Sequence, residues 1–381
     1  MLVEAAEKIG KSYSLDYWRE KDHLKAPPVE LWRDIGKAGF IGGVLPESQG
    51  GSNLKFLDLV LIIESLCAQG GGVPLAQLFM VNTLFGAMVV SRFSNPDQQR
   101  ELLPSLLAGE TIFSFAMTEP NAGNNALGMT MTAKPGSQRS WRVSGQKTWI
   151  TLGRESEKML LVVRTTPIEE VEKKTHGLSI FLVNSNSAGI TYYPIEKTGT
   201  KCLPSYNVFF DDVLLTEANL IGKQDGGWGD LISLLNLERM ITSAGLIGAG
   251  KLSLKLASNY VKERKIFGDA PTGSYQGVQF PLASAFAQIT AAALMNRAAA
   301  WRYDSGLAFE SEANIGKYLA AESTNFATDR SIQVLGGVGF SEEYHVERLW
   351  RDSRIFSVAP IPQEMILSFI AMRDLGLPKS Y

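Results

Sequence analysis

The apolar pattern of this chain changes its period twice, and this change limits the possible folds more than any other feature. Residues 1–114 have helical spacing, residues 115–222 contain short runs rich in β-branched and aromatic residues, and helical spacing returns over 223–381. A chain of 381 residues is long enough to bury several cores. The sequence therefore predicts an α+β protein with an N-terminal helical domain, a middle β-barrel-like domain and a C-terminal four-helix bundle, divided at those boundaries.

Local patterns place the individual elements within these three regions. The expected N-terminal helices cover Val29–Gly39, Phe56–Cys67, Pro74–Phe93 and a segment beginning at Asn95. The expected strands include Met159–Val163, Leu178–Val183, Ile190–Pro194 and Tyr206–Val213. The expected C-terminal helices are Asp230–Lys265, Phe280–Ser305, Ser311–Leu335 and Glu364–Leu375, whose apolar stripes an antiparallel bundle would bury.

Composition excludes several classes of function. The chain has 37 basic and 39 acidic residues with no basic cluster, so we expect no nucleic-acid partner. Cys67 and Cys202 lie far apart and the three histidines are scattered, so we expect neither a disulfide framework nor a metal site. We find no uninterrupted apolar run of the roughly 18 residues that a membrane span needs, and the first residues carry mixed charge. These features predict a cytoplasmic protein without a membrane span.

The segment from Phe115 to Thr151 contains the densest group of informative residues. Phe115–Asn125 is typical of a strand that ends abruptly in a turn, and Gly145–Thr151 is typical of a second short strand. If the strand ends bring Thr118, Trp149 and Thr151 together, they form a flat slot with polar donors and an indole wall. A flavin ring suits such a slot. A glycine-rich hairpin packed under a tryptophan fits the same residues.

Glu238 is the most informative single residue of the C-terminal half. Its neighbours one helical turn away include Leu234, Leu235 and Ile241, so its carboxylate faces the apolar stripe or its margin. Burial raises the pKa of a carboxylate, and a raised pKa suits a general base that works near neutral pH. An ordinary salt bridge to a nearby arginine is the alternative, and the pattern alone does not separate the two.

The motifs Thr118–Asn125 (TEPNAGNN) and Gly145–Thr151 (GQKTWIT) resemble those that frame the flavin in the acyl-CoA dehydrogenase family. Arg264–Gly268 resembles the family's R-x-x-FG motif, and Gln333–Gly339 resembles its Q-x-x-GG-x-G loop. The resemblance implies FAD as cofactor. The implied FAD-binding residues are Phe115, Met117, Thr118, Asn124, Trp149, Thr151, Arg264, Phe267, Gln276, Gln333, Gly336 and Gly337.

The resemblance also implies a reaction and its partners. In the isovaleryl- and long-chain-type branch of the family, a segment resembling Leu235–Gly245 carries the catalytic base, which corresponds here to Glu238. The implied reaction is α,β-desaturation of an acyl-CoA, with proton removal by Glu238 and hydride transfer to flavin N5. Asn124, Asn236 and Arg239 are the expected substrate-binding residues. The implied partners are an electron-transfer flavoprotein, as electron acceptor, and further copies of the chain in a homodimer or homotetramer, since Arg264 would reach a neighbouring subunit's cofactor.

The C-terminal segment departs from the family pattern. Aligned on Arg351 and Asp352, the position where another branch carries its base is Pro360, which has neither an acid–base group nor an N–H. Glu364 is the nearest carboxylate. In the family, the backbone N–H at the position of Pro360 donates to the thioester carbonyl, so the resemblance implies either that Ala359 or Ile361 supplies this donor here or that polarisation of the carbonyl is weakened. Two alternatives follow: a flavin oxidase or monooxygenase of the same fold, or a catalytically impaired flavin-binding partner subunit.

Overall fold

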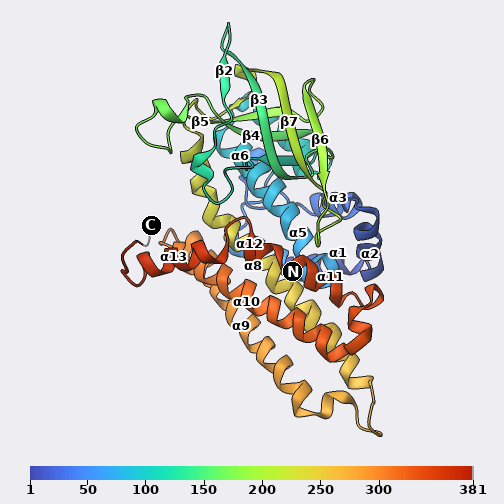
Figure 1. Ribbon diagram of the computed structural model, residues 1–381. Coiled ribbons are helices and arrows are strands. Elements are labelled where there is room, and N and C mark those ends of the chain that lie inside the picture. Colours follow the sequence, from blue (N-terminus) through green and yellow to red (C-terminus); the bar gives the residue numbers. More distant parts are fainter. Residues whose placement is uncertain (380–381) are drawn as a thin grey trace.

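The computed structural model describes residues 1–379, and Figure 1 shows the β-sheets at one end of the molecule and three long helices extending to the other. The N-terminal region is helical, as expected. Its helices are α1 Leu2–Lys11, α2 Leu15–Leu24, α3 Val29–Lys37, α4 Phe56–Leu66, α5 Gly72–Leu78, α6 Val89–Phe93 and α7 Pro96–Leu107, and π-helical turns cover Cys67–Gly71 and Phe79–Met88.

Two helices that the sequence pattern separated, Phe56–Cys67 and Pro74–Phe93, form one bent helical run from Phe56 to Phe93. The bend lies at Gly70, whose φ of 140° and ψ of −31° are not helical. A Cβ atom at Gly70 would lie 2.8 Å from the Trp18 ring, so the bend requires glycine. The π-helical turn allows the chain to continue through this bend, which the sequence pattern could not predict.

The middle region consists of two four-stranded sheets among the described residues, with strand orders β1-β4-β5-β8 and β2-β3-β7-β6. The strands are β1 Phe113–Ala116, β2 Ala133–Pro135, β3 Ser140–Thr151, β4 Lys158–Arg164, β5 Leu178–Asn184, β6 Ile190–Ile195, β7 Ser205–Thr216 and β8 Leu220–Ile221. Strands β1 and β4 pair in parallel, and the other pairs are antiparallel. Trp141, Phe181 and Val208 belong to the apolar core of this region. The expected β domain is confirmed, as two sheets rather than a closed barrel.

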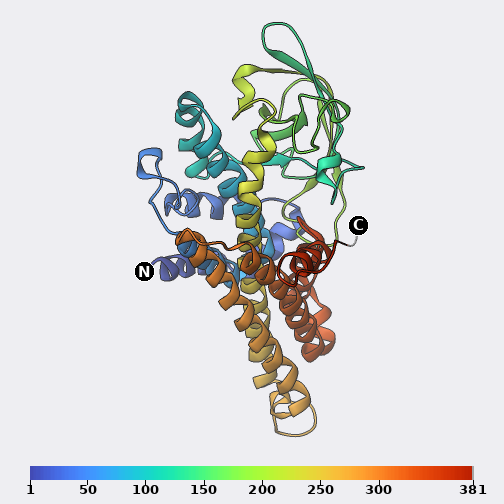
Figure 2. The same cartoon turned by 90° about the vertical axis from the view of Figure 1, so that its left-hand side faces the viewer.

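The C-terminal region contains the four predicted helices and two short ones. They are α8 Gly227–Glu263, α9 Gln276–Asp304, α10 Glu310–Leu335, α11 Val346–Ser353, α12 Ile355–Val358 and α13 Gln363–Arg373. Figures 1 and 2 show α8, α9 and α10 side by side, with the loop between α8 and α9 at the end farthest from the sheets. Helix α13 lies across α10 and buries Ile366.

The expectation of no membrane-length apolar segment needs a correction. Within residues 1–379, three helices are long and apolar enough to cross a membrane: Phe56–Phe93, Gly227–Glu263 and Gln276–Asp304. Scattered polar residues interrupt their apolar runs, which is why a search for uninterrupted runs missed them. The most apolar windows of the first two are 94% and 78% buried inside the fold, whereas that of the third is 28% buried. The outer face of α9 is therefore an exposed apolar surface.

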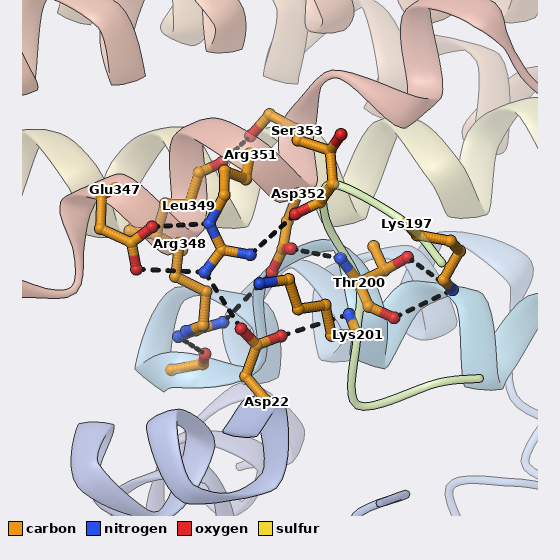
Figure 3. Close-up of polar contacts among 12 residues, drawn as sticks. Asp22, Lys197, Thr200, Lys201, Glu347, Arg348, Leu349, Arg351, Asp352 and Ser353 are labelled. Atoms are coloured by element: carbon orange, nitrogen blue, oxygen red, sulfur yellow. Dashed lines mark hydrogen bonds and ion pairs between the residues drawn. The ribbon is translucent and has the colours of Figure 1, made fainter. Parts of the chain in front are cut away.

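A buried polar cluster joins the three regions (Figure 3). Arg351 of α11 donates to Asp22 of α2 over 3.0 Å, and Asp352 accepts a hydrogen bond of 2.5 Å from the Thr200 N–H. The Lys201 N–H also donates to Asp22, over 3.2 Å. Burial raises the pKa of Asp352 to about 6. The cluster fixes α11, and with it the chain that leads to Pro360, against both other regions.

Candidate active site

A buried ion pair joins the ends of the two motif strands. The Nζ of Lys147 on β3 donates to Oε1 of Glu119 over 2.8 Å and to the carbonyl oxygen of Met117 over 2.9 Å. Glu119 also accepts hydrogen bonds from the N–H groups of Thr130, at 2.8 Å, and Met131, at 3.1 Å. Burial opposes ionisation of Glu119, but the Lys147 charge and these hydrogen bonds hold the pKa of Glu119 below its usual value. The pair thus fixes the loop after β1 against β3.

A β-bulge turns Trp149 outward beside this pair. The register between β3 and β7 shifts between Lys147 and Ile150, and Trp149 has a φ of 61°. The Trp149 side chain is 55% exposed, which is unusual for an indole between buried neighbours. The Thr148 N–H donates to the Thr118 carbonyl over 2.9 Å. Thr118 and Trp149 therefore lie on adjoining strand ends, as the slot expected from the sequence requires.

The other predicted cofactor residues of the β region differ in their surroundings. The ring of Phe115 stacks on that of Phe85 in the N-terminal region, with centroids 4.3 Å apart and planes 5° apart. Thr151 is partly buried, with its hydroxyl 3.5 Å from that of Ser205. Asn124 is exposed in the loop that follows Glu119. Phe115 therefore also joins the β region to the N-terminal region.

The remaining predicted cofactor residues lie far from the slot. Arg264, Phe267 and Gln276 lie at the junction between α8 and α9, and Gln333, Gly336 and Gly337 lie at the C-terminal end of α10. Figure 1 shows these segments at the end of the long helices farthest from the sheets. All six are exposed, and a Cβ atom at Gly336 or Gly337 would meet nothing within 4 Å. Figures 1 and 2 show this end and the sheets on opposite sides of the N-terminal helices. One chain therefore does not bring the two groups of residues into one site.

Glu238 lies inside the molecule on α8, with 2% of its surface exposed and with Leu234 and Ile241 buried nearby. Its Oε1 atom is buried and has no hydrogen-bond partner among residues 1–379. Burial raises the pKa of Glu238 to about 7, although the charges of Arg239 and Lys317 oppose this rise. The salt bridge that the sequence left as an alternative is not formed by Oε1. The group can exchange a proton near neutral pH.

The two expected substrate-binding residues next to the base interact with each other. A guanidinium nitrogen of Arg239 donates to the side-chain oxygen of Asn236, one helical turn away. The Nε of Arg239 is buried and without a hydrogen-bond partner in the described part of the chain. Burial lowers the pKa of Arg239, and the charge of Glu238 opposes this. The unpaired donor gives Arg239 the capacity to bind a further acceptor.

The structure of the C-terminal segment bears on which backbone N–H, that of Ala359 or that of Ile361, is free to bind the thioester carbonyl. The Ala359 N–H already donates to the Ile355 carbonyl over 2.8 Å, at the end of α12. Pro360 is exposed, and Pro362 is buried and precedes the first turn of α13. Of the two N–H groups considered above, that of Ile361 is the better candidate. Glu364 is exposed in the first turn of α13, so its surroundings differ sharply from those of Glu238.

Sequence reasoning did not single out Glu119, Lys147 or Lys317. Glu119 and Lys147 belong to the two quoted motifs. The available signal was that each motif carries one charged residue, of opposite sign, next to a threonine. Lys317 lies within the predicted helix Ser311–Leu335, among small residues that favour close packing. No local pattern shows that its side chain points to the interior, because only the tertiary fold places α12 against α10.

Comparisons with known proteins agree with this architecture. The sequence matches the family models described as acyl-CoA dehydrogenase N-terminal domain over residues 1–110, middle domain over 114–213 and C-terminal domain over 225–375. Acyl-CoA dehydrogenase FadE12 of Mycobacterium tuberculosis is 35% identical over 374 residues, which cover 98% of this chain and 93% of that protein.

Solved structures show the same fold. Butyryl-CoA dehydrogenase from Megasphaera elsdenii superposes with a TM-score of 0.89 at 26% identity, covering 96% of this chain and 95% of that one. A glutaryl-CoA dehydrogenase in complex with glutaryl-CoA superposes with a TM-score of 0.92 at 26% identity, covering 100% and 95%.

These matches define a flavin-dependent oxidoreductase that acts on a CH–CH group. The chain belongs to the acyl-CoA dehydrogenase family. FAD is the cofactor of this family, and desaturation of an acyl-CoA is its reaction. The resemblance stated from the motifs is thereby confirmed at the level of the family.

Proposed function

We propose that this chain desaturates an acyl-CoA thioester between its α and β carbons, with Glu238 as the base that removes the α proton. The observation that carries the proposal is the buried carboxylate of Glu238, whose Oε1 atom lacks a hydrogen-bond partner among the described residues. Burial raises the pKa of Glu238 to about 7, so the group can accept a proton near neutral pH. This placement supports assignment to the isovaleryl- and long-chain-type branch, because Pro360 cannot act as a base.

The residues of the β region fit a flavin. The outward indole of Trp149 offers an aromatic face, and Thr118, Thr151 and nearby backbone groups offer polar edges. When bound there, FAD supplies the acceptor for the hydride that leaves the β carbon. Phe115, Met117 and Asn124 would complete its surroundings, and Asn124, Asn236 and Arg239 would bind the acyl-CoA. We place the domain boundaries at residues 114 and 222, between the helical and β elements.

The distant group of cofactor residues supports a homo-oligomer, dimer or tetramer, in which a second copy brings Arg264 to the flavin. The exposed apolar face of α9 supports the same conclusion, since Phe280, Phe286 and Leu294 are 60%, 64% and 61% exposed. An apolar surface of this length is typical of an interface between subunits. Light scattering that detected only monomers with FAD still bound would contradict this arrangement.

Arg264 provides a direct test of cofactor binding across subunits. Arg264→Ala should weaken FAD retention about tenfold or more, because a hydrogen bond to a charged group contributes roughly 1.5–3 kcal/mol. The matched control is Lys265→Ala, which removes the adjacent exposed charge and should retain FAD. Equilibrium dialysis of released FAD would measure both variants. Equal retention by the two would contradict the assigned role of Arg264.

The reaction itself is tested by anaerobic titration with a panel of acyl-CoAs while the flavin absorbance is followed. Bleaching of the flavin by one or more acyl-CoAs is the expected result. Reoxidation by an electron-transfer flavoprotein rather than by air would support the proposed electron acceptor. A full panel without bleaching would contradict the proposed reaction.

Cell fractionation would test the proposed cytoplasmic location.

A further inference from the structure

Lys317 on α10 is a fully buried lysine with no assigned role. Its side chain has no exposed surface, and its Nζ donates to the carbonyl oxygen of Phe356 on α12. The same Nζ lies 6.0 Å from the centre of the Phe356 ring. A buried ammonium group is costly unless an opposite charge lies nearby. Its hydrogen bond goes to a neutral carbonyl, so its compensating charge must come from elsewhere.

Helix α10, which carries Lys317, packs along α8, which carries Glu238. Glu238 is the buried carboxylate whose charge acts on Lys317. Two cations act on Glu238: Arg239 of its own helix and Lys317 from α10. The π-helical segment Phe79–Met88 and helices α5 and α12, which pack in this region, contain no charged residue.

The charged residues of the other neighbouring elements are paired. Arg297 of α9 is bound to Glu64 over 2.8 Å, and Arg348 of α11 lies 3.5 Å from Asp352. Glu64 also pairs with Lys251 over 2.5 Å, so this group keeps a positive charge, but each of these cations is in contact with a carboxylate. Lys317 is thus a buried cation bound to a neutral group, and Glu238 is a buried carboxylate with an unpaired oxygen.

We propose that Lys317 is a positioning residue for the base: its buried charge favours the ionised form of Glu238, and its hydrogen bond fixes the segment that leads to Pro360. This inference rests on the proposed role of Glu238. An ionised carboxylate is the form that can accept the α proton, so a nearby cation increases the fraction of enzyme that is ready to react. The bond to Phe356 fixes the end of α12, from which the chain continues to the Ile361 N–H.

The direction of the pKa shifts is consistent with this arrangement. Burial lowers the pKa of Lys317 to about 8, and the charge of Glu238 opposes this fall. The charge of Lys317 in turn opposes the rise that burial causes in the pKa of Glu238. Each group therefore favours the charged form of the other. Removal of the lysine charge should raise the pKa of Glu238 further.

The test is the pH dependence of flavin reduction by substrate in the FAD-loaded enzyme. Lys317→Gln removes the charge and keeps a donor for the Phe356 carbonyl, and Lys317→Met removes both. In both variants the acidic limb of the rate profile should move up by about one pH unit or more, with the rate recovering at higher pH. Lys317→Arg keeps the charge and should keep the limb in place.

A matched control separates charge from tethering. Asn325 of α10 donates to the Ser357 hydroxyl of α12 over 2.7 Å, which is a second link between the same two helices without a charge. Ser357→Ala should leave the acidic limb unchanged. If Ser357→Ala moves the limb as far as Lys317→Gln does, tethering rather than charge explains the effect and the inference is wrong.

A second measurement does not depend on turnover. Infrared difference spectra between the wild type and Glu238→Gln, with FAD bound and without substrate, follow the protonation of the Glu238 carboxyl directly. The carboxyl should titrate at higher pH in Lys317→Gln than in the wild type, and an unchanged titration would overturn the inference. If Glu238→Gln still reduces its flavin, the proposed base is wrong, whatever the infrared titration shows. If neither neutral variant folds, Lys317→Arg decides: an unmoved limb supports the inference and a moved limb refutes it.

Discussion

Within residues 1–379, two buried glutamates are each influenced by a buried lysine, and the pKa values of the two glutamates shift in opposite directions although burial raises both. Lys147 and Glu119 are in contact at 2.8 Å, and Glu119 also accepts hydrogen bonds from two backbone N–H groups. Lys317 and Glu238 influence each other only through their charges, and Oε1 of Glu238 has no hydrogen-bond partner in the described structure. The pKa of Glu119 falls below its usual value, whereas that of Glu238 rises to about 7.

The two glutamates differ in their partners as well as in depth: Glu119 contacts a cation and two N–H donors, whereas no donor among the described residues reaches Oε1 of Glu238. Both lysines have their pKa lowered to about 8 by burial, so the lysine environments are comparable. Glu119 is ionised and saturated with donors, which stabilises the joined strand ends and leaves it a weak base. Oε1 of Glu238 lacks a donor among the described residues, and the raised pKa of Glu238 lets the group accept a proton near neutral pH. The first pair joins the two strand ends, and the second contains the proposed base.

The largest expected effect is on the chemical step. Glu238→Gln should slow flavin reduction by substrate roughly 10²–10⁴-fold, the usual loss when a general base is removed. The amide is nearly isosteric with the acid, so packing against Leu234 and Ile241 is retained. Stopped-flow absorbance under anaerobic conditions measures the rate. FAD content and circular dichroism should match the wild type.

Glu364→Gln is the matched control for this variant, since Glu364 is exposed and lies on α13. It should reduce its flavin at nearly the wild-type rate. Loss of reduction in Glu364→Gln, with retention in Glu238→Gln, would assign the chemistry to the C-terminal segment instead.

The next effect in size is on stability, at the other pair. Lys147→Met should lower the free energy of unfolding by about 3–5 kcal/mol, because it leaves the buried carboxylate of Glu119 without its countercharge. Denaturant unfolding followed by circular dichroism measures the loss. The double variant Lys147→Met/Glu119→Gln should recover part of it, since no buried charge then remains unpaired. If the double variant is no more stable than the single one, the two residues do not act as a pair.

The comparison also shows what the sequence could predict. The spacing of apolar residues alone predicted the helix Asp230–Lys265, which is observed as Gly227–Glu263. It also predicted the strand Leu178–Val183, which is observed as Leu178–Asn184. The position of Glu238 on an apolar stripe predicted its burial. The two pairs could not be predicted, because Lys147 and Glu119 are 28 positions apart and Lys317 meets Phe356 across 39 positions. Such contacts depend on the tertiary fold rather than on local spacing.

The cofactor residues illustrate a second limit of sequence reasoning. The positive φ of Trp149 follows from a bulge opposite β7, and an aromatic residue gives no local signal for that conformation. The motifs containing Arg264 and Gln333 carry no indication that they lie far from Trp149 within one chain. The fold shows how far apart one chain keeps the two groups, and the homo-oligomer that would bring them together, which the family resemblance implied through Arg264, stays a prediction.

The smallest effect concerns the pH dependence of stability, and it separates the two pairs again. The pKa of Glu238 in the folded protein lies above its value of 4.5 in the unfolded chain, so the folded state binds this proton more tightly. The resulting stabilisation is fully present below pH 4.5 and is lost as the pH rises through about 7. Glu238→Gln lacks this titration. In Glu238→Gln, Lys317 lacks its countercharge and should have a still lower pKa. This change also makes the variant more stable relative to the wild type as the pH rises.

The stability of Glu238→Gln relative to the wild type should therefore increase between pH 5 and 7, by at most about 3 kcal/mol at roughly 1.4 kcal/mol per pKa unit. Thermal unfolding at a series of pH values measures the difference. Glu119 provides the contrast, because its folded pKa is lowered: the stabilisation it gives is present above the unfolded pKa and is lost as the pH falls. Glu119→Gln should accordingly lose most stability near neutral pH and approach the wild type in acid. If both variants showed the same pH trend, the hydrogen bonds to Glu119 would not account for the difference between the two carboxylates.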